Sequence, residues 1–129
     1  MAINPDEADE SEVAMTAGAL KIGLIGGGGW LGNAITSAIL EAGIVAAENL
    51  TLSYRSRKPD LCSKLNSTQD NQALAAASDI IILSVRPHDW KVLDVDVSDK
   101  LVISVMAGIT MEQLATRHKT DRIVRALPN

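Results

Sequence analysis

The stretch that decides the fold is Lys21–Gly32, which reads KIGLIGGGGWLG. It begins with Lys21–Ile25, a short apolar run that is typical of a strand, and continues with four consecutive glycines. Beyond the glycines, Trp30–Ala42 carries apolar residues at helical spacing, and Gly43 is a typical residue to end a helix. The sequence therefore predicts a strand, a glycine-rich turn and a helix in direct succession.

The glycines at positions 27, 29 and 32 fit the spacing G-x-G-x-x-G, which is typical of a dinucleotide-binding turn. They allow a tight turn, close approach of a pyrophosphate and close packing of the helix, whose N-terminus then faces the phosphates. A turn without a ligand is the alternative, but four adjacent glycines are entropically costly unless close approach is required. We predict that the cofactor is bound here by Gly26, Gly27, Gly28, Gly29, Trp30, Leu31 and Gly32, with the pyrophosphate at the glycines.

Trp30 is an unusual residue beside a phosphate site. We expect it either to stack on the cofactor or shield the pyrophosphate from water, or to pack on a neighbouring loop as an ordinary helix residue. The loop lacks the Gly-Lys-Ser/Thr ending of a Walker loop, which argues against an ATPase.

Strands alternate with helices along the rest of the chain. The patterns predict further strands at Leu50–Tyr54, Ile80–Val85, Leu101–Val105 and Arg122–Ala126. They predict helices over Gln72–Ala77, capped by Asp70 or Asn71, and from a capping box at Thr110–Gln113 to about His118, with short helices over Asp60–Leu65 and Asp89–Leu93. The segment before Asp70 leaves little room for a third strand. This alternation predicts an α/β fold with a Rossmann-like, doubly wound, mainly parallel sheet and helices on both faces.

The end of the second predicted strand indicates which nicotinamide cofactor would bind. Sites specific for NAD carry an acidic residue there, which holds the ribose 2′-hydroxyl. Leu50–Tyr54 ends without an acid and is followed by Arg55-Ser56-Arg57-Lys58. These cations and hydroxyl group can hold a 2′-phosphate, so we predict NADP(H) rather than NAD(H), with Arg55 and Ser56 first and Arg57 or Lys58 assisting. A solvated basic loop is the alternative.

Length and composition limit the number of domains and the classes of protein to which the chain can belong. The chain has 129 residues, of which 47% are hydrophobic and 22% charged, with a formal net charge of −4. This suffices for one domain, and no apolar run approaches the roughly 18 residues of a membrane span. The single cysteine, Cys62, excludes an internal disulfide framework and favours a reducing compartment, so we expect a cytoplasmic protein.

Charge divides the chain into two parts. Residues 1–19 carry five acidic residues and no basic residue. We expect them to form an acidic, disordered leader, with a short helix as the alternative, before an NADP-binding domain at residues 20–129. The near-neutral charge of that domain argues against a nucleic-acid surface.

The two histidines give no catalytic or metal assignment. His88 and His118 lie far apart and no cysteine–histidine cluster accompanies them, so we expect no metal site. We expect His88 at the surface, with an approach to the cofactor as the alternative. We expect His118 at the C-terminus of a helix, where a positive charge would favour the helix dipole. The catalytic residues stay unassigned.

Several further segments carry a resemblance. They are Ser53–Ser56 (SYRS), Asp70-Asn71, Ser84–Pro87 (SVRP), Ile103–Thr110 (ISVMAGIT) and Arg125–Asn129 (RALPN). With the glycine loop, they resemble the N-terminal, coenzyme-binding domain of the pyrroline-5-carboxylate reductase family, from about Lys21 to Asn129. The Ser-x-x-Ala-Gly stretch followed by Arg-x-x-Pro-Asn is the most specific part.

The resemblance implies hydride transfer from NAD(P)H to a cyclic imine, a step of proline biosynthesis. It also implies positions along the cofactor: Arg55 and Ser56 at the adenosine 2′-phosphate, Asn71 at the adenosine ribose, Val85, Arg86 and Pro87 along the ribose and nicotinamide, and Ala107, Gly108 and Asn129 near the nicotinamide. Taken singly, some of these residues have simpler roles, since asparagine also caps helices and proline and glycine also end strands and turns.

The chain departs from the family pattern at several places. Its glycine loop is one residue longer, so the register starts at Gly26 or Gly27, and Arg86, Met106 and Leu127 replace a usual lysine, alanine and methionine. It also ends before the helical second domain, which in the family forms the dimer and much of the substrate site. We therefore expect this chain to bind cofactor without a full active site, and a homodimer to form mainly through that domain.

Three other functions stay open at this point. The chain can belong to another NADP-linked oxidoreductase, such as a deazaflavin-dependent NADP reductase or a 3-hydroxyacid dehydrogenase relative. It can be a non-catalytic dinucleotide-binding module, or a structural domain without a ligand.

Overall fold

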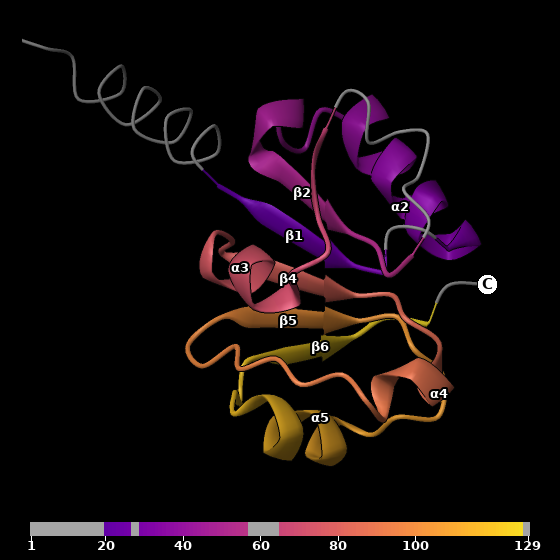
Figure 1. Ribbon diagram of the computed structural model, residues 1–129, viewed down its shortest axis with the longest axis vertical. Coiled ribbons are helices and arrows are strands. Elements are labelled where there is room, and N and C mark those ends of the chain that lie inside the picture. Colours follow the sequence, from indigo (N-terminus) through magenta and orange to yellow (C-terminus); the bar gives the residue numbers. More distant parts are fainter. Residues whose placement is uncertain (1–19, 27–28, 57–64, 128–129) are drawn as a thin grey trace, which may run out of the picture.

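The computed structural model describes residues 20–26, 29–56 and 65–127 (Figure 1). The strands are β1 (Ile22–Ile25), β2 (Leu50–Ser53), β3 (Asn66–Thr68), β4 (Ile80–Leu83), β5 (Leu101–Ser104) and β6 (Ile123–Arg125). The helices are α2 (Trp30–Glu41), α3 (Asn71–Ala76), α4 (Pro87–Trp90) and α5 (Met111–His118), with a 3₁₀ turn, η1, at Ala47–Asn49. The predicted alternation of strands and helices is thus confirmed.

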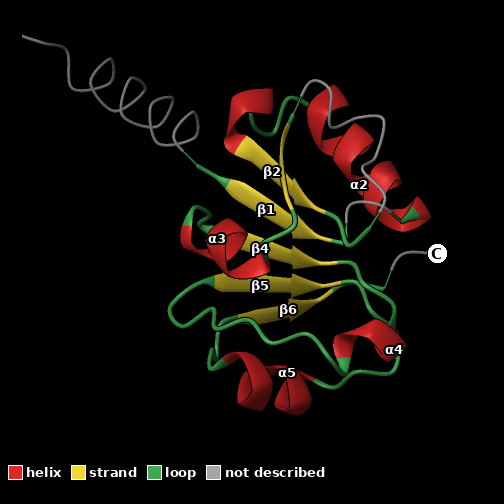
Figure 2. Cartoon of the chain, viewed as in Figure 1, coloured by secondary structure: helices red, strands yellow, loops and turns green. Residues whose placement is uncertain are grey.

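The strands form one six-stranded sheet in the order β3-β2-β1-β4-β5-β6, and every neighbouring pair is parallel. The chain first builds outward from β1 through β2 to β3 and then returns to the other side of β1 through β4. The strand order therefore reverses beside β1, which is the doubly wound arrangement that the sequence predicts. In Figure 2 the arrows of the labelled strands point toward the edge of the sheet where α4 lies.

The sheet has an apolar layer on each face. On one face, Ile39 of α2 packs with Leu24, Leu50 and Leu52 from the sheet. On the other face, Leu74 of α3, Trp90 of α4 and Leu114 of α5 pack with alternate residues of β4, β5 and β6. Because side chains alternate along a strand, β1 and β4 contribute to both layers, as the near-continuous apolar run of Ile80–Leu83 requires.

The expectation that little room is left for a third strand before Asp70 is wrong. The segment before Asp70 does hold a strand, β3, which is only three residues long and pairs with β2 from Thr51↔Asn66 to Ser53↔Thr68. It lies at the edge of the sheet and consists of Asn, Ser and Thr, so it gives no apolar signal in the sequence. The helix expected over Asp60–Leu65 falls outside the described residues except for Leu65, and the leader expected at residues 1–19 falls wholly outside them.

Helix ends follow their local sequence. The Asp70 carboxylate accepts hydrogen bonds from the backbone N–H groups of Gln72 and Ala73, both at 3.0 Å, so Asp70 rather than Asn71 caps α3. The capping box that starts α5 is confirmed, because Gln113 N–H donates to the Thr110 hydroxyl at 3.1 Å and Thr110 N–H donates to the Gln113 side chain at 2.8 Å. The expected Asp89–Leu93 helix begins earlier, since Pro87 opens α4 instead of only ending the strand.

His118 is a buried structural residue rather than a charge at a helix end. Its side chain is 1% exposed, its Nε2 accepts a hydrogen bond from the Trp90 indole at 2.8 Å, and its Nδ1 lies 2.9 Å from the Val95 carbonyl oxygen. These contacts fit the neutral ring with the proton on Nδ1. Burial lowers the pKa of His118, so the expected interaction of a positive charge with the helix dipole is wrong. His88 is exposed, as expected.

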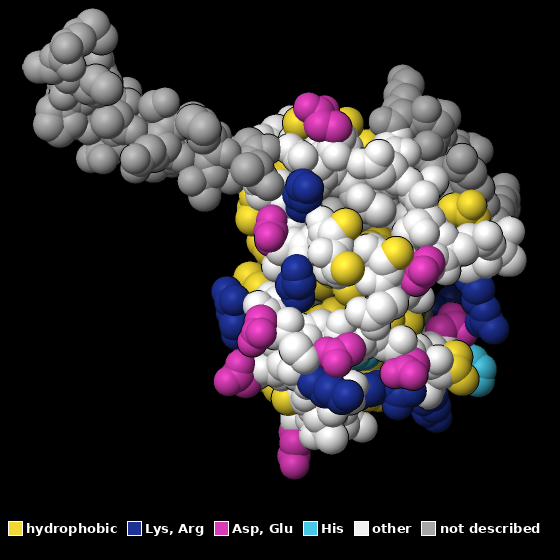
Figure 3. Space-filling model, turned by 60° about the vertical axis from the view of Figure 1, so that its left-hand side comes forward, with side chains coloured by type: hydrophobic (Ala, Val, Ile, Leu, Met, Phe, Trp, Pro, Cys, Tyr) yellow, Lys and Arg dark blue, Asp and Glu magenta, His cyan; other side chains and the backbone are white. Residues whose placement is uncertain are grey.

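The described residues show neither a membrane-spanning helix nor a metal-binding cluster. Among the described residues, no helix is both long enough and apolar enough to cross a membrane, and no group of three or more His, Cys, Asp or Glu side chains is placed to hold a metal ion. On the face shown in Figure 3, acidic and basic side chains are interspersed and form no continuous basic patch.

Candidate functional site

A cavity of about 560 Å³ opens at the carboxyl ends of β1, β2 and β4. This is the place where the strand order reverses, and open α/β sheets bind ligands at such a crevice. Residues from the ends of these strands, from the segments that follow them and from the residues after β3 line it: Ile25, Gly26, Gly29, Ser53, Tyr54, Arg55, Ser56, Gln69, Asn71, Ser84, Val85, Arg86, Asp89, Val92 and Leu93.

Gly26 lets the chain turn at the floor of this cavity. Its φ is +97°, a conformation that L side chains rarely adopt, and a Cβ there would lie 2.7 Å from the Ser84 carbonyl oxygen. The turn thus brings the loop after β1 against the loop after β4. Glycine at this position is required by the protein itself.

Gly29 differs from Gly26 in a way that points to a ligand. Its φ is −86°, and among the described residues beyond its chain neighbours the nearest atom to a Cβ built there is the Gly26 carbonyl oxygen at 3.6 Å, an ordinary contact. The fold therefore has room for a side chain at Gly29, yet the sequence leaves that space open toward the cavity.

The N-terminus of α2 faces the same space. Gly29 is its N-cap residue, no side chain caps the helix, and no acidic residue lies in its first turn. The first N–H groups of a helix have no partner within the helix, and together with the helix dipole they favour an anion. The 12-residue helix therefore presents an anion-binding end beside an open glycine position.

The end of β2 and the residues after it add hydroxyl and cationic groups to the cavity. Ser53, which ends β2, is buried, and its hydroxyl oxygen lies 3.4 Å from Gly26 N, a long hydrogen bond. Arg55 follows with a side chain that is 80% exposed, and its guanidinium pairs with Asp89 at 3.2 Å. The Gln69 side chain donates to the Arg55 carbonyl at 2.9 Å and so fixes the backbone of this segment. A serine and an arginine thus stand where NAD-specific sites place an acid.

Ser84 provides a buried polar atom that lacks a partner. Its hydroxyl oxygen is buried and makes no hydrogen bond to the described part of the chain, while its backbone N–H continues the sheet by donating to Ile25 at 2.9 Å. Buried hydroxyl groups nearly always have partners. Since Ser84 lines the cavity, a bound polar ligand would satisfy it.

The structure brings together part of the predicted set. Seven predicted residues line the cavity: Gly26, Gly29, Arg55, Ser56, Asn71, Val85 and Arg86. Six lie outside its lining: Trp30, Leu31, Gly32, Pro87, Ala107 and Gly108. Gly27, Gly28, Arg57 and Asn129 fall outside the described residues, as do Lys58 and Cys62.

Trp30 is 84% exposed, so its expected packing on a neighbouring loop does not occur. Ala107 and Gly108 follow β5 and are exposed at the same edge of the sheet as the cavity.

Sequence reasoning missed several lining residues. Ser53, Tyr54 and Ser84 lie at or directly after strand ends, a position that could have marked them. Asp89, Val92 and Leu93 belong to α4 and the segment after it, whose path over the cavity has no local signal.

A family match agrees with this geometry. Residues 21–108 match the model of the family described as "NADP oxidoreductase coenzyme F420-dependent". The chain belongs to this family. The matched region of this NADP oxidoreductase family runs from β1 to the turn after β5, so it contains every residue that lines the cavity.

Individual relatives are similar over most of the chain. The pyrroline-5-carboxylate reductase of Methanosarcina acetivorans is 35% identical over 119 residues, a match that covers 84% of this chain and 44% of that protein. The Plasmodium falciparum pyrroline carboxylate reductase, crystallised with NADP bound, is 31% identical with a TM-score of 0.72 and covers 85% of this chain and 42% of that one. The Coxiella burnetii pyrroline-5-carboxylate reductase is 28% identical with a TM-score of 0.75, covering 86% and 44%.

These relatives confirm the resemblance that the sequence predicts. They also show that this member of the NADP oxidoreductase family spans less than half the length of the curated relatives it matches.

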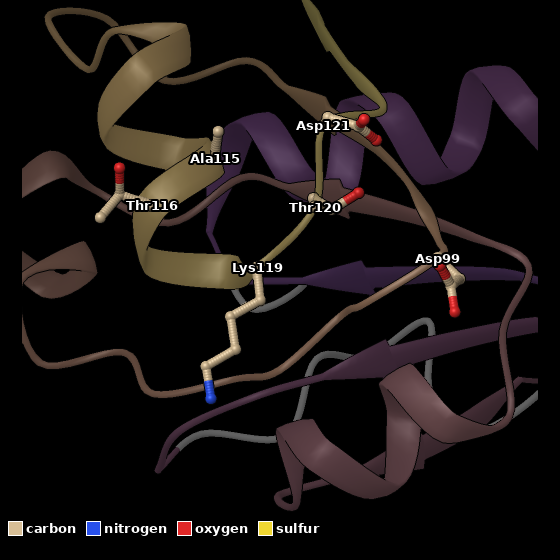
Figure 4. Close-up of a pocket in the computed structure, with 6 residues that line it drawn as sticks. All are labelled: Asp99, Ala115, Thr116, Lys119, Thr120 and Asp121. Carbon is tan, nitrogen blue, oxygen red and sulfur yellow. The ribbon is translucent and has the colours of Figure 1, made fainter.

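A second hollow, of about 470 Å³, lies at the opposite end of the sheet (Figure 4). Its lining comes from the turn before β5 and from the C-terminal end of α5 with the residues that follow: Asp99, Ala115, Thr116, Lys119, Thr120 and Asp121. The side chains in Figure 4 fan outward and do not converge on a common point. Lys119 instead pairs with Asp96 at 3.8 Å, so this hollow offers no set of groups arranged around a ligand.

Proposed function

We propose that this chain is the coenzyme-binding part of an NADP(H)-dependent oxidoreductase that reduces a cyclic imine. The observation that carries the proposal is the cavity beside β1, where an uncapped helix N-terminus and the open position at Gly29 face the same space as Arg55 and Ser56. These groups fit a dinucleotide with two separate anionic sites, its pyrophosphate and its 2′-phosphate. The NADP-bound relative supports the choice of cofactor.

Each end of the cofactor would meet different residues. The loop from Gly26 to Gly29 and the first turn of α2 would hold the pyrophosphate, and the Ser84 hydroxyl would gain a partner. Arg55 and Ser56 would hold the 2′-phosphate, with Arg57 assisting, and Asn71 would contact the adenosine ribose. Val85 and Arg86 would line the ribose and nicotinamide side, and Pro87, Ala107, Gly108 and Asn129 would lie toward the nicotinamide.

The reaction divides between the cofactor and the protein. NADPH supplies the hydride when it is bound, while the chain binds and orients it. In this proposal residues 20–129 are the NADP-binding domain and residues 1–19 are an acidic leader. The substrate is a small cyclic imine, as the names of the relatives support, and its positioning against the nicotinamide falls to parts of the relatives that this chain does not span. A homodimer and a cytoplasmic location stay predictions of the same proposal.

A second candidate follows from the family description. The matched family is described as coenzyme F420-dependent, and coenzyme F420 is a deazaflavin, so a reductase that exchanges hydride between NADP and a deazaflavin shares the same cofactor site. The relatives named as pyrroline-5-carboxylate reductases favour the first candidate. Assays of the full-length protein that carries this chain, with pyrroline-5-carboxylate and with reduced F420, distinguish the two substrates.

Titration of this chain with NADPH and NADH, followed by the heat of binding, tests the cofactor site. We expect NADPH to bind at least about tenfold more tightly than NADH. Equal affinities would overturn the assignment of Arg55 and Ser56 to a 2′-phosphate. Binding of neither dinucleotide would overturn the cofactor site and favour a structural domain.

A further inference from the structure

The ion pair between Arg55 and Asp89 joins two segments that line the cavity. Arg55 follows β2 and Asp89 lies on α4, which follows β4, and these two strands flank β1 on opposite sides. The Arg55 guanidinium lies 3.2 Å from the Asp89 carboxylate, and both residues line the cavity. The pair therefore links the segments that follow the two strands beside β1, within the lining of the cavity.

The two partners differ in how firmly they are held. Asp89 stands next to Trp90, which is 6% exposed and donates its indole N–H to the buried His118. The carboxylate is thus carried by an anchored turn. The Arg55 backbone is also held, by the Gln69 side chain, but its guanidinium is on a long side chain that is 80% exposed. A change of partner would therefore move Arg55 and leave Asp89 in place.

Asp89 also stands out by its charge. Among the described residues that line the cavity, Asp89 is the only acidic residue, and Arg55 and Arg86 are the two cationic residues. A carboxylate that pairs with a guanidinium occupies one of the N–H donors of that guanidinium. It also repels a phosphate that approaches the same guanidinium. Exposed ion pairs of this kind are weak, so a phosphate can displace the carboxylate from the guanidinium. Breaking the ion pair nevertheless costs free energy.

We propose that Asp89 is a specificity-determining residue that competes with the 2′-phosphate of NADP(H) for Arg55. This inference rests on the proposed function. The competition lowers the affinity for NADP(H) and leaves the affinity for NAD(H) unchanged, because NAD(H) carries no 2′-phosphate to compete. Asp89 thereby sets a smaller preference between the two cofactors than Arg55 alone would give.

Substitution Asp89→Asn tests the proposal, because it removes the charge and keeps the size of the side chain. Titrated at low ionic strength, D89N should bind NADPH about threefold more tightly than wild type, and NADH equally well. The gain should shrink at about 1 M salt, since both partners are exposed. In the R55Q background the same substitution should give no gain, because the carboxylate then has no guanidinium to occupy.

D121N is the matched control. Asp121 is exposed and lies at the second hollow, at the other end of the sheet, so this variant makes the same charge change away from the cavity. It should leave the dissociation constants for both cofactors unchanged. Circular dichroism checks that all variants are folded, and D89S provides a second neutral variant if D89N is not.

The outcomes separate this inference from the proposed function. A wild-type chain that does not prefer NADPH contradicts the proposed 2′-phosphate site itself. If wild type prefers NADPH but D89N binds it equally well or more weakly, the site stands and the competition is overturned. If D89N tightens NADPH and NADH alike, Asp89 closes the cavity to every dinucleotide, and the proposed specificity is again overturned.

Discussion

At the scale of single residues, the two glycines of the cavity floor separate what the fold needs from what a ligand needs. Beyond its chain neighbours, the Cβ of Gly29→Ala meets no atom of the described residues closer than 3.6 Å, and the residue keeps an ordinary φ of −86°. We expect the free energy of unfolding to change by less than about 1 kcal/mol, because a slightly worse N-cap is offset by a less flexible unfolded chain. The added methyl group occupies space that the pyrophosphate needs, so NADPH should bind at least about tenfold more weakly. Calorimetric titration and chemical denaturation measure the two effects.

Gly26→Ala is the comparison variant for that prediction. Its Cβ would lie 2.7 Å from the Ser84 carbonyl oxygen at a φ of +97°, so it should destabilise the fold itself. A G29A chain that binds NADPH like wild type would contradict the placement of the pyrophosphate at Gly29.

At the scale of elements, α5 anchors the segment that covers one side of the cavity. The Arg117 side chain donates to the carbonyl oxygens of Leu93, at 2.9 Å, and Lys91, and its guanidinium lies 4.9 Å from the centre of the Trp90 ring. His118 adds its hydrogen bonds to Trp90 and Val95. The last turn of α5 thus fixes α4 and the residues after it, including Leu93 of the cavity lining.

This anchor should make stability depend on pH. Burial lowers the pKa of His118 below its ordinary value of 6.5, so the unfolded chain binds a proton that the folded chain resists. The stabilising contribution of the neutral, buried His118 is complete above pH 6.5. It is lost as the pH falls from 6.5 through the lowered pKa of the folded chain. In this window the free energy of unfolding should fall by up to about 1.4 kcal/mol per pH unit. Urea unfolding measured across the window gives this slope.

Histidine variants provide the control for the slope. His118→Gln removes the titrating group and should flatten the slope, although it also destabilises the fold at neutral pH. His88 is exposed and takes no part in this anchor, so His88→Gln is the matched histidine variant. An unchanged slope in H118Q would show that another group titrates there.

The elements also show what a sequence can reveal. Three features were predictable: the strand–glycine–helix unit, the capping box at Thr110 and the parallel direction of the strands. Each depends on residues a few positions apart or on a simple apolar period. Three other features were not predictable: the polar edge strand β3, the Trp90–His118 bond across 28 residues and the Arg55–Asp89 pair across 34 residues. Their partners meet only after the sheet has formed, so no local pattern marks them.

At the scale of the whole molecule, cofactor binding should stabilise the fold as a unit. A ligand that binds only the folded chain adds about 2.7 kcal/mol at a concentration of 100 times its dissociation constant. For a domain of this size, that should raise the thermal midpoint by roughly 10 °C with NADPH. Differential scanning calorimetry measures the shift, and NADH at the same concentration should give a smaller one. No shift with NADPH would contradict the proposed site.

The central place of β1 has a consequence for how the protein is made. Its partner on one side, β4, pairs through Ile22↔Ile80, and Lys21 and Asp79 beside that pair are 58 residues apart in the chain. At a synthesis rate of about 5–20 residues per second, β4 leaves the ribosome about 3–12 seconds after β1. During that interval the nascent chain can offer β1 only β2 as a neighbour, with its other edge and its apolar side chains open to water. Among the described strands, the one that carries the glycine turn is therefore synthesised first, yet it gains its second neighbour only after β2 and β3 have been made.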